Sequence, residues 1–517
     1  MVTGDWPLTG APDRPEHPAV PGPGTGNGRL RPARDRGLAW LRAEGPDIVT
    51  ESGQPVLLRG VGVGGWLNME NFITGYPSTE SLQREALRRA LGDEAYQAFF
   101  QRFTDCFFAD ADAAYLASLG FNCVRLPVNY RLLIDDREPQ QVRDSGLELL
   151  GRAVGTCAAH GLYTILDLHA LPGGQNADWH SDNPTHRAAF WEYRAFQDQV
   201  VMLWQAVARY FAGQPAVAGY NPVNEPAEPA GELIALFYQR LAAAIRQEDP
   251  RHILFLDGNK HGTDFSAFGP GPASPASPAS TLPANTVFAV HDYALPGIAA
   301  DGIYPGRTRG EWFDRDVVEQ TFLRRTEFMR ETGTPVWVGE FGPIYTGEGA
   351  RDDTRYALLR DQLEIYQSSA AHWSLWTYKD LGMQGLVAAR PDSPYVRRIA
   401  PVLEKKRRLG TDSWGGTDAQ IRQVTGPIGE LFDQEFPAFD PYPGGRGPWI
   451  SRIVQGILLA EPLAEDFGRC FAGLSPDAAA ELADSFAFGA CLRNERLAAL
   501  VRQYTGPPGQ AGGPHAD

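Results

Sequence analysis

The sequence predicts an α/β fold in which eight parallel strands, each followed by a helix, close into a (β/α)8 barrel with extra C-terminal helices. Two observations lead to this prediction. Eight apolar segments of strand length recur along the chain, and helical patterns separate them. Polar side chains close most of these segments at the C-terminal end, where barrels of this kind carry their active sites.

The eight predicted strands are enriched in Val, Ile, Leu and aromatic residues. They cover residues 56–63, 122–128, 162–169, 217–225, 252–258, 286–293, 335–341 and 372–378. Helical patterns between them include residues 231–247 and 316–331. A doubly wound open sheet is the alternative, but no G-x-G-x-x-G or phosphate-binding loop follows any of these strands.

The composition of the two ends of the chain predicts disorder, and the sequence between them predicts one large domain. Residues 1–36 are rich in Pro, Gly and Arg without a hydrophobic period, so we expect a disordered leader. A disordered tail is expected at 506–517 and a flexible loop at 269–285. Residues 37–505 then form a single catalytic domain. Helical patterns that predict the C-terminal extension of this domain occupy residues 395–410, 450–472 and 476–503.

Composition excludes several classes of partner. The net charge of −16 argues against nucleic acid or an anionic membrane, since both require clustered Lys and Arg. The five cysteines are widely spread without C-x-x-C spacing, so neither a disulfide framework nor a zinc site is predicted. No signal peptide and no apolar run of about 18 residues is visible. The predicted location is cytoplasmic, and the sequence makes no prediction of oligomeric state.

Titratable or hydrogen-bonding side chains end six of the eight predicted strands. In a barrel these ends converge on one face, so we expect the side chains to form one site. They are Arg125, His169, Asn224 with Glu225, His291 with Tyr293, Glu340 and Trp376.

Two glutamates of this set carry the functional prediction. Glu225 follows the fourth strand and Glu340 ends the seventh, which places their carboxylates across a narrow pocket. At a separation of about 5–5.5 Å, one carboxylate attacks a sugar while the other protonates the leaving oxygen. Solvated loop glutamates are the alternative, but each residue follows directly on an apolar strand.

An ordered set of motifs extends over roughly residues 50–385. Its members are RGVGVGGWLNMENF (59–72), NCVRLPVNY (122–130), DLHALPGGQN (167–176), NPVNEP (221–226), HDY (291–293), GEFG (339–342) and the strand of Trp376. In this order the motifs resemble glycoside hydrolase family 5, the cellulase family, and the first of them is similar to the exo-β-1,3-glucanase branch of that family.

The resemblance implies roles for the central residues. Glu225 is expected to be the acid/base and Glu340 the nucleophile of a retaining hydrolase. Arg125 is expected to pair with Glu340 and to favour its charged form. Asn224 is expected to donate a hydrogen bond to the sugar 2-hydroxyl.

The resemblance also implies how the rest of the site binds carbohydrate. His169 and His291 are expected to orient the substrate or the carboxylates, and Tyr293 to place its hydroxyl near the nucleophile. Trp376 is expected to form the aromatic floor under the sugar ring. Neither a metal nor another cofactor is implied. Possible pocket walls, chosen from loops after the first and third strands, are Trp66, Glu70, Asn176, Trp179 and His180.

The leading prediction is therefore an exo-acting β-glycosidase, similar to β-glucosidases or exo-β-1,3-glucanases, that acts on oligosaccharides or glycoconjugates. An endo-β-glucanase or a furanosidase of the same family is the alternative enzyme. A non-catalytic carbohydrate-binding barrel is the alternative from another class, and it predicts the loss of at least one of the two glutamates.

Overall fold

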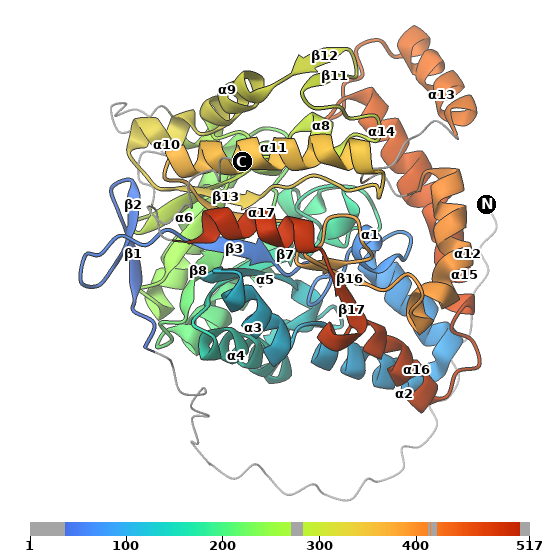
Figure 1. Ribbon diagram of the computed structural model, residues 1–517, viewed down its shortest axis with the longest axis horizontal. Coiled ribbons are helices and arrows are strands. Elements are labelled where there is room, and N and C mark those ends of the chain that lie inside the picture. The colour runs from blue at the N-terminus through green and yellow to red at the C-terminus, as the bar shows by residue number, and fades with distance from the viewer. Residues whose placement is uncertain (1–36, 270–282, 412–413, 415–420, 507–517) are drawn as a thin grey trace, which may run out of the picture.

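A computed structural model describes residues 37–269, 283–411, 414 and 421–506 (Figure 1). The predicted leader at 1–36, most of the loop at 269–285 and all but the first residue of the tail at 506–517 lie outside these residues.

The core of the protein is a closed barrel of eight parallel strands, which confirms the predicted (β/α)8 fold. The strands follow one another around the barrel in chain order, and the last pairs with the first. Each lies within or overlaps one of the predicted segments. They are β3 (Arg59–Gly62), β4 (Cys123–Asn129), β7 (Tyr163–Ala170), β8 (Val217–Asn221), β9 (Ile253–Asp257), β10 (Thr286–His291), β13 (Val336–Glu340) and β14 (His372–Leu375).

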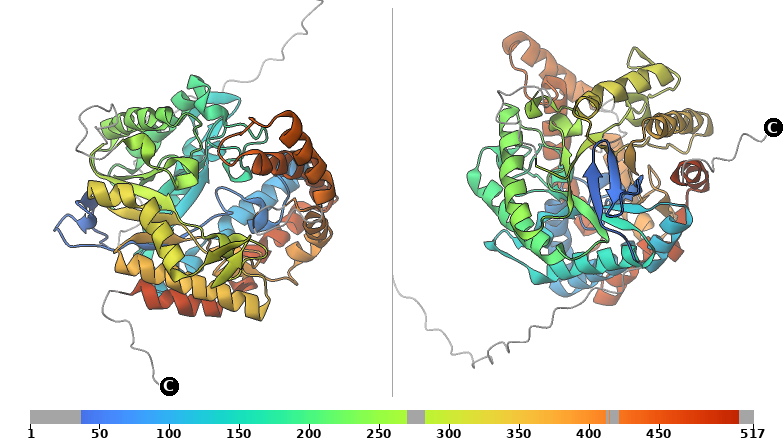
Figure 2. Two further views of the ribbon diagram at one scale, coloured as in Figure 1. Left: turned by 90° about the horizontal axis from the view of Figure 1, so that it is seen from above. Right: turned by 90° about the vertical axis from the view of Figure 1, so that its left-hand side faces the viewer.

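Helices surround the barrel and bury one apolar face each (Figure 2). In α5 (Arg194–Phe211), Val200, Leu203, Trp204 and Val207 are buried at the three- and four-residue spacing of a helix face. The predicted helix at 316–331 is interrupted at Thr326, whose hydroxyl donates to the carbonyl of Phe322. The other main helices around the barrel are α2 (Glu80–Phe107), α3 (Asp110–Ser118), α4 (Asp144–Ala159), α6 (Glu232–Glu248), α9 (Arg315–Arg325), α10 (Glu327–Thr332), α11 (Gly349–Ser368) and α12 (Pro394–Leu409).

A hairpin closes the N-terminal end of the barrel. It consists of β1 (Leu41–Glu44) and β2 (Asp47–Thr50), which pair antiparallel. Ala43 donates its backbone N–H to Asn285, just before β10, and Ile48 packs into the apolar cluster inside the barrel. Further short elements are β5 (Ile134–Asp135) with β6 (Glu138–Val142), β11 (Gly306–Thr308) with β12 (Glu311–Phe313), α1 (Asn71–Thr74), α7 (Asn259–Gly262) and α8 (Leu295–Ile298).

The chain after the barrel folds back over it as a mainly helical extension. Its helices α15 (Ala460–Arg469) and α16 (Pro476–Ala483) pack against α2 (Figure 1). The prediction of a helix over 476–503 is wrong in the middle of that range, because β17 (Cys491–Arg493) pairs there with β16 (Val387–Ala389). This three-residue strand is fixed by its partner rather than by a pattern of its own. The remaining elements are α13 (Arg422–Glu435), α14 (Arg446–Ile453), the π-helical turn Val454–Leu458, α17 (Glu495–Thr505) and β15 (Lys379–Asp380).

No helix among the described residues is long and apolar enough to cross a membrane. All five cysteines lie in the described part of the chain, and all are free thiols.

A buried lysine ties the extension to the barrel. The ammonium group of Lys379 lies 2.7 Å from Oδ1 of Asp112, and neither side chain is exposed. The same ammonium donates to the backbone carbonyls of Phe107, at the end of α2, and Phe486, in the extension. A buried charge needs such partners because desolvation is costly.

We predict that Lys379→Met lowers the free energy of unfolding by about 3–5 kcal/mol, because the carboxylate of Asp112 is left buried without its cation. The control is Lys405→Met, which removes an exposed ion pair with Asp466 and is expected to cost no more than about 1 kcal/mol. Chemical denaturation measures both variants, and equal losses would contradict the prediction.

Candidate active site

A cavity of about 350 Å³ opens at the C-terminal ends of the barrel strands. We call it the rim cavity. Six of the residues predicted from the strand ends line it, and they come from β7, β10, β13 and the segments after β8, β10 and β14. These residues are His169, Glu225, His291, Tyr293, Glu340 and Trp376.

Glu340, the last residue of β13, is held by two donors. Nη1 of Arg125 on β4 donates to its Oε1 at 2.6 Å, and the hydroxyl of Tyr293 donates to its Oε2 at 3.0 Å. Burial favours the neutral form of Arg125, but Asp167 and Glu340 outweigh this and raise the pKa of Arg125 above its usual value. The guanidinium therefore carries a permanent positive charge that stabilises a carboxylate at Glu340.

Glu225 lies in a strained turn after β8. The strand ends at Asn221, four residues earlier than the segment 217–225 predicts, because Pro222 has no N–H for the ladder. The φ angle of Glu225 is +45°, in the left-handed region that side chains rarely adopt. Two contacts hold this conformation: the Glu225 N–H donates to Asp257 at 2.9 Å, and the amide of Asn176 donates to the Glu225 carbonyl at 3.0 Å.

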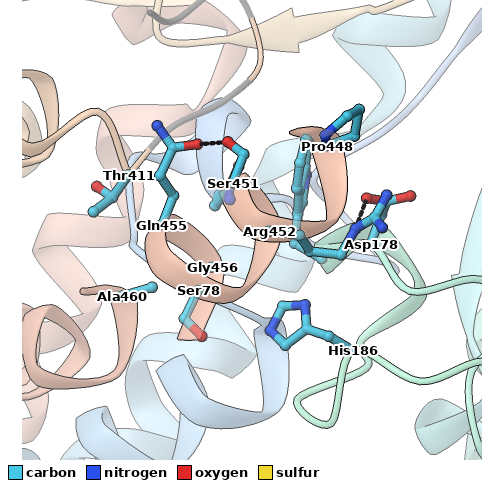
Figure 3. A pocket seen from close by; sticks show the side chains of 12 residues that line it. Ser78, Asp178, His186, Thr411, Pro448, Ser451, Arg452, Gln455, Gly456 and Ala460 are labelled. Carbon is cyan, nitrogen blue, oxygen red and sulfur yellow. Dashed lines mark hydrogen bonds and ion pairs between the residues drawn. The ribbon is translucent and has the colours of Figure 1, made fainter. Parts of the chain in front are cut away.

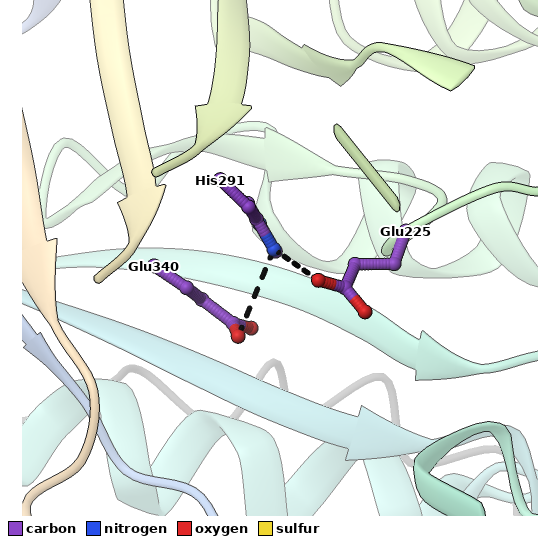
Figure 4. A group of neighbouring side chains, drawn as sticks. All are labelled: Glu225, His291 and Glu340. Atoms are coloured by element: carbon purple, nitrogen blue, oxygen red, sulfur yellow. Dashed lines mark hydrogen bonds and ion pairs between the residues drawn. The ribbon is translucent and has the colours of Figure 1, made fainter. Parts of the chain in front are cut away.

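His291, the last residue of β10, lies between the two carboxylates (Figure 4). Its Nδ1 is 2.6 Å from Oε1 of Glu225 and 3.7 Å from Oε2 of Glu340. Burial alone lowers the pKa of His291, but Glu340 and Glu225 outweigh it and raise this pKa above its usual value. Burial favours the neutral form of Glu225 and would raise its pKa, but the charge of His291 and its hydrogen bond outweigh burial and lower the pKa of Glu225. The pair therefore titrates as one unit that shares a proton across a short hydrogen bond.

The same three residues are the one candidate for a cation site within the described parts of the chain. One donor atom from each of Glu225, His291 and Glu340 lies within 4.8 Å of the other two. Hydrogen bonds from Arg125 and Tyr293 to Glu340, and from His291 to Glu225, already use these carboxylate oxygens. The geometry is explained by proton sharing, and we assign no metal to it.

His169, on β7, supports the floor of the rim cavity. Its ring stacks on that of Trp376, with centroids 5.5 Å apart and an interplanar angle of 2°. Its Nδ1 lies 2.7 Å from Asp167, and its Nε2 lies 3.4 Å from Glu70. Burial lowers the pKa of His169, but Asp167 and Glu70 outweigh it and raise this pKa to about 10. The ring is therefore an imidazolium at neutral pH.

The structure separates the residues that line the rim cavity from those that support it. Asn224 lies behind Glu225 and accepts a hydrogen bond from Arg125 at 2.6 Å. Glu70, Trp179 and His180 line the cavity as predicted walls, and the Nε2 of His180 lies 3.2 Å from Glu225.

Two of the other predicted walls have different positions. Asn176 is buried beneath the cavity and holds His180 and the Glu225 backbone. The prediction for Trp66 is wrong, because its indole N–H donates to the Thr104 carbonyl and its ring packs against Phe108, away from the cavity.

Sequence reasoning missed several residues of the site. Asp257 ends the fifth strand, so the strand-end rule that found Glu340 would have found it as well. Asp178 and His261 line the cavity from loops, where no periodic pattern marks them. Trp414 comes from the extension and packs 4.9 Å from Tyr293 and 6.0 Å from Phe72, a contact that tertiary folding alone creates.

This geometry agrees with the similarity of the chain to known glycosidases. Residues 98–382 match the family model Cellulase (glycosyl hydrolase family 5). A β-xylosidase of Phanerodontia chrysosporium is 42% identical over 472 residues, which are 89% of this chain and 97% of the relative. This chain belongs to glycosyl hydrolase family 5. A probable glucan 1,3-β-glucosidase A of Aspergillus niger is 27% identical over 66% of this chain and 89% of its own length.

Membership in family 5 makes the protein an O-glycosyl hydrolase of the retaining type, with a carbohydrate substrate. It also rules out the non-catalytic binding barrel. The match ends at residue 382, so Trp414 and α13 to α17 lie beyond the part of the chain that the family model covers.

The site predicts a pH-dependent stability. A histidine whose pKa rises from 6.5 to about 10 on folding stabilises the fold fully below pH 6.5, and this contribution is lost as pH rises towards 10. We predict that the free energy of unfolding falls more steeply between pH 6.5 and 10 in the wild type than in His169→Gln. Denaturation at several pH values measures the slopes. His160→Gln, at a surface pair with Asp110, is the control, and parallel curves for wild type and His169→Gln would refute the prediction.

Proposed function

We propose that the protein is an exo-acting β-glycosidase that removes a terminal β-xylosyl residue from short oligosaccharides or glycosides. The observation that carries the proposal is the pair Glu225 and Glu340, with carboxylate oxygens within 4.8 Å of each other in one cavity. Retaining glycosidases space their carboxyl groups about 5–5.5 Å apart, whereas inverting enzymes need about 6.5–9.5 Å to admit a water. The 42% identity to a β-xylosidase supports the sugar.

In the first step Glu340 is the nucleophile. Its carboxylate donates an electron pair to the anomeric carbon, and the bond from that carbon to the leaving oxygen breaks. Glu225 receives a proton from His291 across their hydrogen bond and passes it to the leaving oxygen, and a glycosyl ester forms on Glu340. The short hydrogen bond to His291 keeps a proton within 2.6 Å of the Glu225 oxygen, although the charged forms of both are favoured at rest.

In the second step Glu225 acts as the base. It takes a proton from water, whose oxygen attacks the anomeric carbon while Glu340 leaves as a carboxylate. Arg125 and Tyr293 stabilise that departing charge through the contacts to the two oxygens of Glu340. The sugar keeps its anomeric configuration because each step inverts it once.

Exo action is supported by the walls of the rim cavity. Trp414 packs between Phe72 of α1 and Tyr293, and its indole N–H donates to Gln384 at 2.7 Å. It therefore forms a wall on one side of the rim cavity, which it lines together with Glu70 and Phe72. A site with such a wall fits the end of a chain better than an open groove does. The cytoplasmic location that the sequence suggests stays a prediction.

A terminal β-glucosyl residue is the second candidate, favoured by the similarity to the glucan 1,3-β-glucosidase of Aspergillus niger. Turnover of p-nitrophenyl β-xylopyranoside and β-glucopyranoside by the purified protein separates the two. A higher kcat/KM for the xyloside is expected. If the protein hydrolyses neither substrate, the proposed function is overturned.

We predict that Glu340→Ala abolishes this turnover, because no carboxylate remains to form the ester. Sodium azide is expected to restore activity and to yield a glycosyl azide of inverted configuration, which NMR identifies. Glu311→Ala, at an exposed glutamate of β12, is the control and is expected to keep full activity. Unchanged turnover in Glu340→Ala would remove this residue from the mechanism.

We predict a loss that depends on the leaving group for Glu225→Ala. Turnover of xylobiose, whose leaving sugar needs a proton, is expected to fall by about 10²–10⁴-fold. Formation of the ester from a dinitrophenyl xyloside needs no acid and is expected to change little, as a pre-steady-state burst of dinitrophenol would show. Equal losses in ester formation from both substrates would argue against Glu225 as the acid.

A further inference from the structure

A second cavity, of about 220 Å³, shares part of its lining with the rim cavity, and Figure 3 shows the side chains around it. We call it the side cavity. Asp178 and Trp179 line both cavities, so the loop that carries them is a shared wall. The opposite wall consists of α14 and the π-helical turn, from which Ser451, Arg452 and Gln455 face the cavity. This wall lies beyond residue 382, where the family match ends.

The side cavity contains polar atoms that the protein leaves without partners. Oδ1 of Asn71, Oγ of Ser78 and Nε1 of Trp179 are buried and form no hydrogen bond. The side chains of Asn71 and Ser78 belong to residues only 3% exposed. Buried polar groups in proteins are nearly always satisfied, so three unsatisfied ones in residues of one cavity lining are unusual. The lining also includes Ser451, Arg452 and Gln455, and polar residues of this kind suit a ligand with several hydroxyl groups.

An ion-pair network fixes the shared wall in place. Oδ1 of Asp178 accepts from Nε of Arg452 at 2.9 Å, and Oδ2 lies 2.9 Å from Nε2 of His261. Burial would raise the pKa of Asp178, but Arg452 and His261 outweigh it and hold this pKa well below its usual range. Arg452 lines the side cavity and His261 the rim cavity, so Asp178 links the two walls through charge.

The position of Glu225, the proposed acid, indicates which part of the substrate lies near the shared wall. Oε2 of Glu225 lies 3.2 Å from His180, the neighbour of Trp179 in the shared loop. If Glu225 protonates the leaving oxygen, as proposed above, then the leaving group departs on the side of this loop and away from Glu340. The side cavity lies next to the same loop.

We propose that the side cavity binds a sugar residue of the leaving group, and that the C-terminal extension thereby selects which glycosides are cleaved. The ring of Trp179 supplies an apolar surface, and Asn71, Ser78 and Gln455 supply partners for hydroxyl groups. This inference rests on the proposed function, since it takes Glu225 as the acid.

The test compares a long and a short leaving group with the same terminal sugar. Ser451→Trp fills the side cavity, and Gln455→Ala removes a polar contact without adding bulk. Both are expected to lower kcat/KM for xylotriose by about tenfold, the worth of one or two hydrogen bonds, mainly through KM. Turnover of p-nitrophenyl β-xylopyranoside is expected to stay within about twofold, since no sugar enters the side cavity. Leu458→Ala, exposed on the same π-helical turn, is the control.

Equal losses on both substrates, or no loss on xylotriose in either variant, would overturn the inference. A binding measurement separates this failure from that of the proposed function. Titration of Glu340→Ala with xylobiose and with cellobiose is expected to show about tenfold weaker binding when Ser451→Trp is added. Binding that Ser451→Trp leaves unchanged for both probes would refute the side cavity as a sugar site, whatever the protein hydrolyses.

Discussion

The guanidinium of Arg125 is the charge around which the rim of the barrel is assembled. It is fully buried, and such a charge persists only where every donor has a partner. Its contacts reach Glu340 on β13, Asp167 on β7 and Asn221 at the end of β8, together with Asn224 in the turn that follows. Four segments of the rim are therefore fixed relative to one another by one side chain. The position of Glu340, the floor around His169 and the turn of Glu225 are all linked through this one guanidinium.

The turn of Glu225 adds a second constraint, because its backbone is strained and must be held from outside. Asp257 below and Asn176 beside it supply the hydrogen bonds that do so. The same turn points the carboxylate at His291, and the contact between them favours the protonated imidazole and the ionised carboxylate together. Backbone strain and proton position are thus set by the same few contacts, and a change in either is expected to alter the other.

The barrel could be predicted from the sequence because parallel strands buried on both faces are nearly continuous apolar runs, which a pattern search detects. The two glutamates and their neighbours could be predicted because a barrel brings strand ends together, whatever the loops do. Trp66 was misassigned since a large aromatic residue in a loop can pack inward as readily as toward a ligand. Trp414 and Arg452 carry no pattern of their own, and only the path of the extension brings them to the rim. The strand β17 likewise depends on a partner distant in sequence, whereas the break at Thr326 involves a local hydrogen bond to Phe322.

The wall that α14 and the π-helical turn add to the side cavity is structurally separate from the barrel strands that hold the carboxylates. Residues such as Ser451 and Gln455 contact neither Glu225 nor Glu340, so substitutions there leave the reacting groups in place. Substitutions in this segment can therefore change which leaving groups the protein accepts without moving Glu225 or Glu340. Libraries directed at residues 446–460, which lie beyond the part of the chain that the family model covers, are therefore a rational starting point for engineering an altered substrate range.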